Sequence, residues 1–297
     1  MSKNTPLTLP SEPKQPSKAP ISPLTNPIYV GTMGWNYPDW MGVFYPANTP
    51  LRDSLTAYSR TFSSVEIDST FYGTPREAQV VRWHQMTPPD FVFCPKVPRL
   101  ITHDMALKEV DAPLAEFLRV MENLKEKRGA ILFQFPPTFT RADLPQLEAL
   151  LPKLEELGMG GERFAMEFRH RSLIGEDVSA LLSEHNIALA SADIVNMPRR
   201  FEVTTDFIYI RLIGKHGAYN HHKHTQTDKS EFVERWAGVL RSQHERFERA
   251  YVFCNNDYEG YSPATCNRLK AALGLPVIEP VVEVQGSLFQ EADVQGN

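Results

Sequence analysis

The sequence predicts an α/β fold, a single (β/α)8 barrel of the TIM type. Eight short apolar runs recur along the chain, and most are separated by segments with apolar residues every three or four positions. The region 28–275 also has close to the ~250 residues that such a barrel requires. An open doubly wound sheet would show the same alternation, but no GxGxxG follows the first run, which weakens its dinucleotide-binding version. We therefore expect a barrel.

The expected elements follow one another in chain order. The eight apolar runs, read as parallel strands, are Ile28–Trp35, Ser64–Asp68, Phe91–Lys96, Ala130–Phe135, Phe164–Arg169, Ile187–Asp193, Phe207–Ile213 and Tyr251–Asn256. The segments with helical periodicity are Leu51–Phe62, Pro75–Met86, Pro113–Lys127, Asp143–Leu157, Asp177–Glu184, Lys229–Arg249 and Pro263–Leu273. Only a short connection separates the sixth and seventh runs, so we expect one helix to be short or missing there.

The two ends of the chain differ in composition from the region between them. Residues 1–27 contain seven prolines but no glycine and no aromatic residue, and the chain shows no helical or strand period after about Glu279. Neither end can bury a hydrophobic core. We expect a disordered proline-rich arm over 1–27 and a flexible tail over 276–297.

Composition also restricts the class of protein. The net charge of −5 means that nucleic-acid binding would require a local basic patch. No run approaches the ~18 apolar residues of a membrane span, and the N-terminus has no apolar segment of a secretory signal. The three cysteines, Cys94, Cys254 and Cys266, form no CxxC pair. These features predict a cytoplasmic protein with no membrane contact and no disulfide framework.

Polar side chains end most of the expected strands, where a parallel barrel carries its chemistry. Because side chains alternate across a strand, Glu66, Lys96 and Glu167 fall on the face opposite the bulky residues of their strands. These three are the candidate catalytic residues. The candidate substrate-binding residues are Trp35, Tyr72, His103, Gln134, Arg169, Asp193, Tyr209, Arg211, Asn255 and Asn256.

This mixture of charges predicts an anionic ligand. Lys96, Arg169 and Arg211 would hold a phosphate or carboxylate, which guanidinium groups match in geometry. Glu66 and Glu167 would transfer protons if neighbouring charges separate their pKa values. Lys96 could instead form a Schiff base. Three alternatives stay open: a structural network of ion pairs across the barrel mouth, a non-catalytic ligand-binding barrel, and a glycosidase that uses the two glutamates.

Metal ligands are less clearly indicated. No expected strand ends in histidine, so a zinc site of the kind found in barrels is poorly supported. Glu66, Glu167 and Asp193 offer the oxygen ligands that Mg²⁺ or Mn²⁺ prefers. The loop after the seventh run contains four histidines, His216, His221, His222 and His224. We interpret this segment as a solvated loop or a lid over the mouth rather than as a transition-metal site.

The end of the first run and the segment after it are rich in glycine and aromatic residues, from Gly31 through Trp35, Tyr37 and Trp40 to Tyr45. Two interpretations are equally supported. The aromatic rings either seal the barrel or form a wall on which a sugar or base stacks.

The chain resembles the YecE-like proteins, the domain-of-unknown-function family numbered 72, over 28–273. The motifs that carry the resemblance are Gly31-Thr32, Gly34-Trp35, Trp40, Phe44-Tyr45-Pro46, Val65-Glu66-Ile67, Ser69-Thr70-Phe71-Tyr72, Lys96, Thr102-His103, Leu132-Phe133-Gln134, Pro136-Pro137, Glu167-Phe168-Arg169, Asp193, Tyr209, Arg211, Trp236-Ala237 and Asn255-Asn256. The resemblance implies a TIM barrel but no established reaction. The sequence departs from the family pattern at Asp68, where Asn is usual, at Leu173 for Trp, and at Ile213 for His.

A short peptide in the tail suggests a partner. Gln285, Leu288 and Phe289 are spaced like the peptide by which bacterial repair and replication proteins bind the sliding clamp. The match is only five residues long, so chance similarity is a strong alternative. The leading hypothesis is a cytoplasmic barrel enzyme that acts on an anionic, phosphate-bearing small molecule or on nucleic acid. A clamp-associated adaptor is the alternative.

Overall fold

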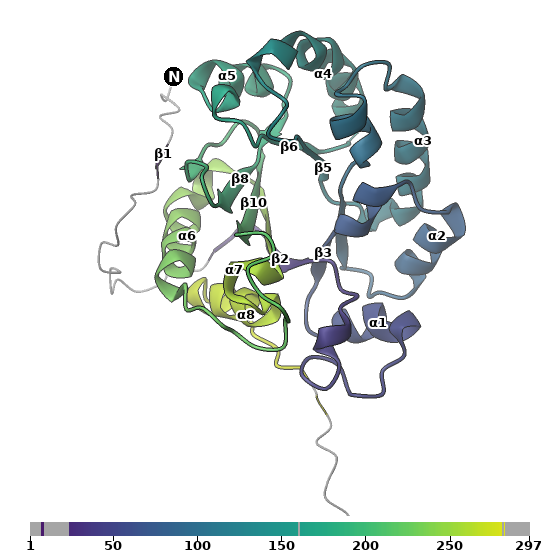
Figure 1. Ribbon diagram of the computed structural model, residues 1–297, viewed down its shortest axis with the longest axis vertical. Coiled ribbons are helices and arrows are strands. Elements are labelled where there is room, and N and C mark those ends of the chain that lie inside the picture. The colour runs from purple at the N-terminus through teal and green to yellow at the C-terminus, as the bar shows by residue number, and fades with distance from the viewer. Residues whose placement is uncertain (1–6, 9–23, 160, 281, 283–297) are drawn as a thin grey trace, which may run out of the picture.

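The computed structural model describes residues 7–8, 24–159, 161–280 and 282. Figure 1 shows strands toward the centre of the molecule and helices around them. The longer strands are β2 (Ile28–Met33), β3 (Ser64–Ile67), β4 (Val92–Pro95), β5 (Ile131–Gln134), β6 (Phe164–Glu167), β8 (Ser191–Ile194), β10 (Phe207–Gly214) and β11 (Arg249–Cys254). The helices are α1 (Ser54–Tyr58), α2 (Glu77–Gln85), α3 (Asp111–Met121), α4 (Leu144–Met159), α5 (Glu176–Glu184), α6 (Ser230–Gln243), α7 (Asn256–Glu259) and α8 (Ser262–Ala272).

The central strands form two parallel sheets. One has six strands in the order β4-β3-β2-β11-β10-β8, and the other has the order β5-β6-β7, where β7 is Ala188–Leu189. A parallel bridge between Lys96 and Leu132 connects the end of β4 to β5, and only Ala190 separates β7 from β8. These pairings confirm the predicted α/β fold with a parallel, TIM-barrel-like strand order.

The sixth expected strand is divided into β7 and β8, and no helix lies between Ile194 and Phe207. The connection instead contains β9 (Arg200–Phe201), which pairs antiparallel with β1 (Leu7–Thr8). The missing helix agrees with the sequence prediction, whereas strand pairing in the N-terminal arm was not expected. The rest of the arm through residue 23 lies outside the described residues.

The tail also lies mostly outside the described part of the chain. Residues 276–280 and 282 are described and form no helix or strand. The clamp-like peptide with Gln285, Leu288 and Phe289 falls entirely in the residues that are not described, so it stays a prediction.

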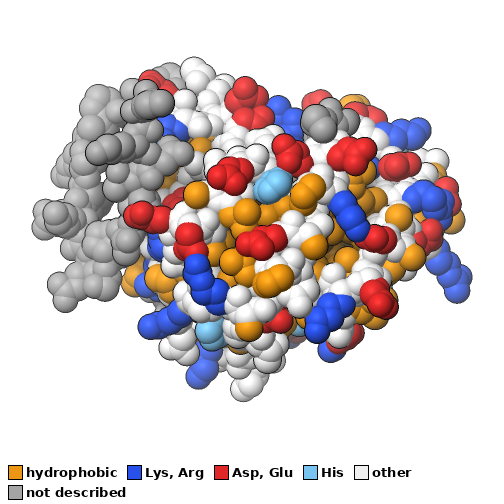
Figure 2. All heavy atoms as spheres, turned by 90° about the horizontal axis from the view of Figure 1, so that it is seen from above, with side chains coloured by type: hydrophobic (Ala, Val, Ile, Leu, Met, Phe, Trp, Pro, Cys, Tyr) orange, Lys and Arg blue, Asp and Glu red, His pale blue; other side chains and the backbone are white. Residues whose placement is uncertain are grey.

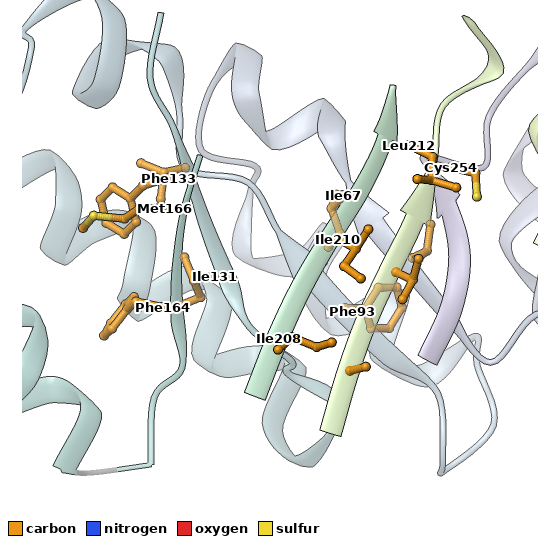
Figure 3. Packing of buried hydrophobic residues seen from close by; sticks show 14 of the residues in the cluster. Ile67, Phe93, Ile131, Phe133, Phe164, Met166, Ile208, Ile210, Leu212 and Cys254 are labelled. Atoms are coloured by element: carbon orange, nitrogen blue, oxygen red, sulfur yellow. The ribbon is translucent and has the colours of Figure 1, made fainter. Parts of the chain in front are cut away.

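Successive side chains of the buried strands alternate between two core clusters, as predicted. On β6, Phe164 and Met166 belong to the core cluster packed against the helices, while Ala165 belongs to an inner cluster. Figure 3 shows Phe164 and Met166 on the side of their strand that faces the helices. The inner cluster contains residues of both sheets, among them Leu132 of β5 and Tyr209 of β10. The two faces of each strand therefore have separate cores, as a barrel-like arrangement requires.

The outer surface carries mixed charge where it can be seen. Figure 2 shows acidic and basic side chains interspersed with apolar ones, with no large area of a single sign on that face. A polyanion would therefore have to bind somewhere other than the face in Figure 2.

Within the described ranges, no helix combines the length and apolar character needed to cross a bilayer.

Candidate functional site

Arg211 lies at the centre of a buried network of charged side chains. It is on β10 and only 3% of its side chain is exposed. Its guanidinium donates from Nη2 and Nε to the two carboxylate oxygens of Glu66 on β3, at 2.7 and 2.9 Å. Its Nη1 donates to Glu167 on β6 at 2.6 Å. The Tyr209 hydroxyl donates to Glu66 at 2.8 Å. One arginine therefore holds carboxylates from both sheets.

Glu167 also pairs with Arg169, which follows β6. Burial raises the pKa of Glu167, but the Arg169 and Arg211 guanidiniums outweigh it and lower the pKa to about 2. Against an ordinary value of 4.5, this pairing stabilises the fold above pH 4.5, and the stabilisation is lost as the pH falls toward 2. Glu167 is therefore an anion at neutral pH and no acid.

Arg169 is the most exposed cation of the network. Its side chain is 19% exposed, against 7% for Lys96 and 3% for Arg211. Its Nε binds Glu167, and among the described residues its Nη1 and Nη2 have no hydrogen-bond partner. These two amino groups can therefore bind a ligand without breaking the pair.

Lys96, one residue beyond β4, forms the other ion pair. Its Nζ donates to Asp68 at 3.0 Å and lies 4.0 Å from the centroid of the Phe71 ring. Burial lowers the pKa of Lys96, which Asp68 opposes and Arg211 reinforces. The charge of Asp68 supplies the partner of Lys96. A buried lysine with a lowered pKa is suited to act as a base or nucleophile.

His103 is held beside Lys96 by an irregular segment. It lies in a π-turn over Leu100–Asp104, and its Nδ1 is 2.9 Å from the hydroxyl of the buried Thr102. Its ring contacts Phe71 edge-on, with centroids 4.9 Å apart. Burial and, to a smaller extent, the positive charges of Lys96 and Arg99 lower the pKa of His103 to about 4. His103 is therefore a neutral imidazole at pH 7, able to exchange a proton.

The backbone after His103 is strained. Ala106, Leu107 and Glu109 have φ values of 47°, 65° and 54°, which non-glycine residues rarely adopt. Strain of this kind persists only where the surrounding structure imposes it, and it concentrates at functional sites. The π-turn and the strained backbone both lie in the loop after β4, and both are features that concentrate at functional sites.

Asp193 does not join this network. It accepts hydrogen bonds from the Tyr258 hydroxyl at 2.9 Å, from Trp236 Nε1 at 3.2 Å and from Arg199 Nε at 2.5 Å. Its register partner on β10 is Leu212, which faces the helices. Asp193 therefore lies on the outer side of its strand, away from the Arg211 network, although the sequence places it among the candidate substrate-binding residues.

Asn255 and Asn256 point to different sides of the end of β11. Asn255 Nδ2 lies 3.5 Å from Met33 Sδ, close to the network, because Arg211 also contacts that sulfur. Asn256 is buried on the other side and accepts hydrogen bonds from the backbone and hydroxyl of Ser262 at 3.0 and 2.8 Å. Asn256 therefore positions α8 and does not face the mouth.

The aromatic segment after β2 packs mainly into the core. Trp40 and Tyr45 are fully buried, and Trp35 contacts Trp83 of α2 edge-on at 5.5 Å between ring centroids. The strand ends at Met33 and the chain turns at Gly34 with φ +85°, so alternation does not carry Trp35 inward. Trp40 and Tyr45 are therefore core residues, and neither offers an exposed ring on which a ligand could stack.

Comparison with known proteins identifies the family and the fold. The model of the family described as "Protein of unknown function DUF72" matches residues 29–285. The chain belongs to this family. Over 143 residues it is 35% identical to UPF0759 protein YecE of Escherichia coli K12, covering 48% of each chain, and it is 31% identical to UPF0759 protein YunF of Bacillus subtilis over 151 residues, covering 49% of this chain and 51% of YunF. The alignments thus span about half the length of these curated relatives.

Solved structures of the DUF72 family have the same fold. A DUF72 protein of Thermotoga maritima, 29% identical, superposes with a TM-score of 0.70 over 84% of this chain and 99% of its own. A DUF72 protein of Enterococcus faecalis, 18% identical, gives 0.68 over 85% and 100%. The second likeness concerns the fold alone.

Several residues of the DUF72 site were not among the predicted candidates. Asp68 and Thr102 contact Lys96 and His103 directly. Tyr37 is half-buried, and its hydroxyl donates to the backbone carbonyl of Met33, whose sulfur contacts Arg211. Desolvation, followed by the charges of Asp68 and Glu66, raises the pKa of Tyr37. Strand alternation places Asp68 on the face of Glu66, so the sequence does carry a signal for it. The position of Tyr37, in a loop, has no such signal.

The expected Mg²⁺ or Mn²⁺ ligands are not gathered in the DUF72 chain. Asp193 faces outward, and the Arg211 guanidinium lies between Glu66 and Glu167. Within the described ranges, no group of three or more His, Cys, Asp or Glu side chains is placed to hold a metal ion. The carboxylates instead bind cations of the protein itself.

The histidine loop after β10 is anchored to neighbouring segments. The backbone N–H of His222 donates to Asp39 at 2.8 Å, and the rings of His221 and His224 are 4.8 Å apart. His216 is exposed and lies 3.3 Å from Asp257. The loop therefore connects the segment after β2 to the end of β11.

Proposed function

We propose that this DUF72 protein is an enzyme that acts on an anionic, phosphate-bearing substrate at the carboxyl ends of its strands. The observation that carries the proposal is Arg169. This guanidinium is oriented by an ionised carboxylate and keeps two amino groups free among the described residues. Lys96 and the neutral His103 lie on neighbouring loops, within electrostatic range of each other. Arginine amino groups in this arrangement suit a phosphate oxygen pair.

The proposal gives the two glutamates a positioning role. Glu66 and Glu167 together accept three hydrogen bonds from Arg211. The carboxylate lone pairs that face Arg211 are therefore occupied. A carboxylate with a pKa of about 2 is a weak base and no general acid at neutral pH. This argues against Glu167 as the acid of the glycosidase alternative, which needs one protonated carboxyl group. His103 and Lys96 are the better proton-transfer groups.

We further propose that the two sheets close into one barrel of eight strands, with β7 and β8 as its divided sixth strand. The Lys96–Leu132 bridge and the short link at Ala190 support closure at both edges. The inner cluster supports it too, because side chains from both sheets pack within it. In such a barrel the network lies at the mouth.

A thermal-shift panel on the full chain tests the binding. Inorganic phosphate, ribose 5-phosphate and nucleotides are the probes. A ligand at one hundred times its dissociation constant adds about 2.7 kcal/mol, hence a shift of several degrees. We expect the shift to be lost in Arg169→Ala and reduced in Arg169→Lys. Arg119→Ala is the control, because Arg119 on α3 also pairs with glutamates but on the outer surface.

The outcomes are distinct. No shift with any phosphate, or an equal shift in wild type and Arg169→Ala, contradicts the proposed site. A ligand that binds but is recovered unchanged after prolonged incubation supports the non-catalytic barrel instead. If the protein is an enzyme, His103→Gln keeps the thermal shift and loses turnover.

The pH dependence of stability provides a separate check on His103. Its folded pKa of about 4 lies below the ordinary 6.5, so the unfolded chain takes up the proton first as the pH falls. The folded state therefore loses stability between pH 6.5 and 4, and His103→Gln is expected to lose less over this window. Urea midpoints at several pH values measure both. Parallel curves for the two proteins would show that His103 is not shielded as described.

A further inference from the structure

Tyr72 is an exposed aromatic residue at the edge of the charged network. Its relative exposure is 79%, the highest of the large apolar side chains in the described part of the chain. It ends the turn Asp68–Tyr72 that supplies the partner of Lys96. An exposed tyrosine loses the contact energy that its ring could gain. A ring kept in solvent beside a binding site suggests that a ligand covers it.

The turn that carries Tyr72 is fixed in place. The Thr70 hydroxyl donates to the backbone carbonyls of Ile67 and Lys96 at 2.7 and 2.6 Å. Phe71 is held between the Lys96 ammonium and the His103 ring, at 4.0 and 4.9 Å. Tyr72 contacts Phe71 edge-on, with centroids 5.6 Å apart. Its ring is therefore attached to a rigid support next to Lys96.

Tyr72 also lies on the side of the mouth. Phe71, which contacts Tyr72, lies between Lys96 and His103 of the loop after β4. On the neighbouring turn, Leu100 is exposed as well. The charged groups and the apolar rim are thus adjacent. A ligand that satisfies both has an anionic group at one end and a flat apolar ring at the other.

We propose that the ligand is a nucleoside phosphate, with its phosphate on Arg169 and Lys96 and its base stacked on Tyr72. This inference rests on the proposed anion site and specifies its substrate class. A base presents a flat π-face that stacks on an exposed tyrosine ring, and the ring of Phe71 supports Tyr72 from its own side. Stacking of a base on an aromatic ring raises affinity about 5- to 150-fold.

Calorimetric titration with adenosine 5′-monophosphate and ribose 5-phosphate separates the two contributions, because both carry the phosphate and only one carries a base. We expect the nucleotide to bind at least about fivefold more tightly to wild type. Tyr72→Ala is expected to abolish this preference and to leave the affinity for ribose 5-phosphate within about twofold. Tyr72→Phe, which retains the ring, keeps the preference. The exposure of Tyr72 makes both variants compatible with folding.

Each other outcome overturns the inference. Equal affinity of wild type for the two ligands excludes base stacking but leaves the anion site intact. Equal weakening of both ligands by Tyr72→Ala places Tyr72 on the sugar or phosphate and not on a base. Binding of neither ligand, while Arg169 is intact, overturns the anion site and this inference together.

Discussion

Replacing Arg211 with methionine is expected to lower the free energy of unfolding by about 3–5 kcal/mol, because it leaves the buried Glu66 carboxylate without a partner charge and removes one of the two cations that pair with the buried Glu167. Glu66 and Glu167 are 0% and 1% exposed in their ion pairs with Arg211. Arg169 still pairs with Glu167, but no other cation forms an ion pair with Glu66 among the described residues. Urea denaturation at pH 7 measures the loss.

The triple variant Arg211→Met, Glu66→Gln, Glu167→Gln shows whether charge is the cause. It removes the carboxylates together with the guanidinium, so most of the lost stability is expected to return. Arg119→Met is the matched surface control; its ion pairs are about half exposed, so solvent screens them and their loss should change stability little. If Arg211→Met behaved like Arg119→Met, the network would not be buried as described.

Alanine at Gly31 is expected to cost several kcal/mol, or to prevent folding, because the strands leave no room for a side chain. A Cβ at Gly31 on β2 would lie 2.0 Å from the carbonyl oxygen of Ser64 on β3. That atom belongs to the backbone, so the two strands would have to separate. Since Glu66 follows Ser64 on β3, the distortion would reach the network as well. Thermal unfolding of the purified variant gives the change.

Gly238 on α6 supplies the opposite case within the same chain. A Cβ there meets nothing within 4 Å, and alanine is a better helix former than glycine by about 1 kcal/mol. Gly238→Ala is therefore expected to raise the unfolding temperature slightly. Equal effects at Gly31 and Gly238 would mean that the close approach of β2 and β3 does not exist in solution.

The inward face of several strands was predictable from alternation alone. Bulky residues such as Phe164 and Met166 identify the helix-facing side, so Glu167 had to face the other way. The same rule, applied to the sixth strand, indicates the outward position of Asp193. Ala188, Ala190 and Ala192 pack on the inner side, and Asp193 has the opposite parity. Asp193 was grouped with the candidate substrate-binding residues because it ends its expected strand, without regard to which face of the strand it occupies.

Periodicity by itself determined the α/β class, the parallel strand order, the missing sixth helix and the charged strand ends, because these depend on residues close together in the chain. Only the tertiary structure decided which charges meet. Arg211 contacts Glu66 across 145 positions of sequence and Glu167 across 44. Such contacts depend on the registers of separate strands, which local patterns do not specify. Lys96, Arg169 and Arg211, expected together as anion-binding cations, each pair with a carboxylate, and among the described residues Arg169 keeps both terminal amino groups without a hydrogen-bond partner.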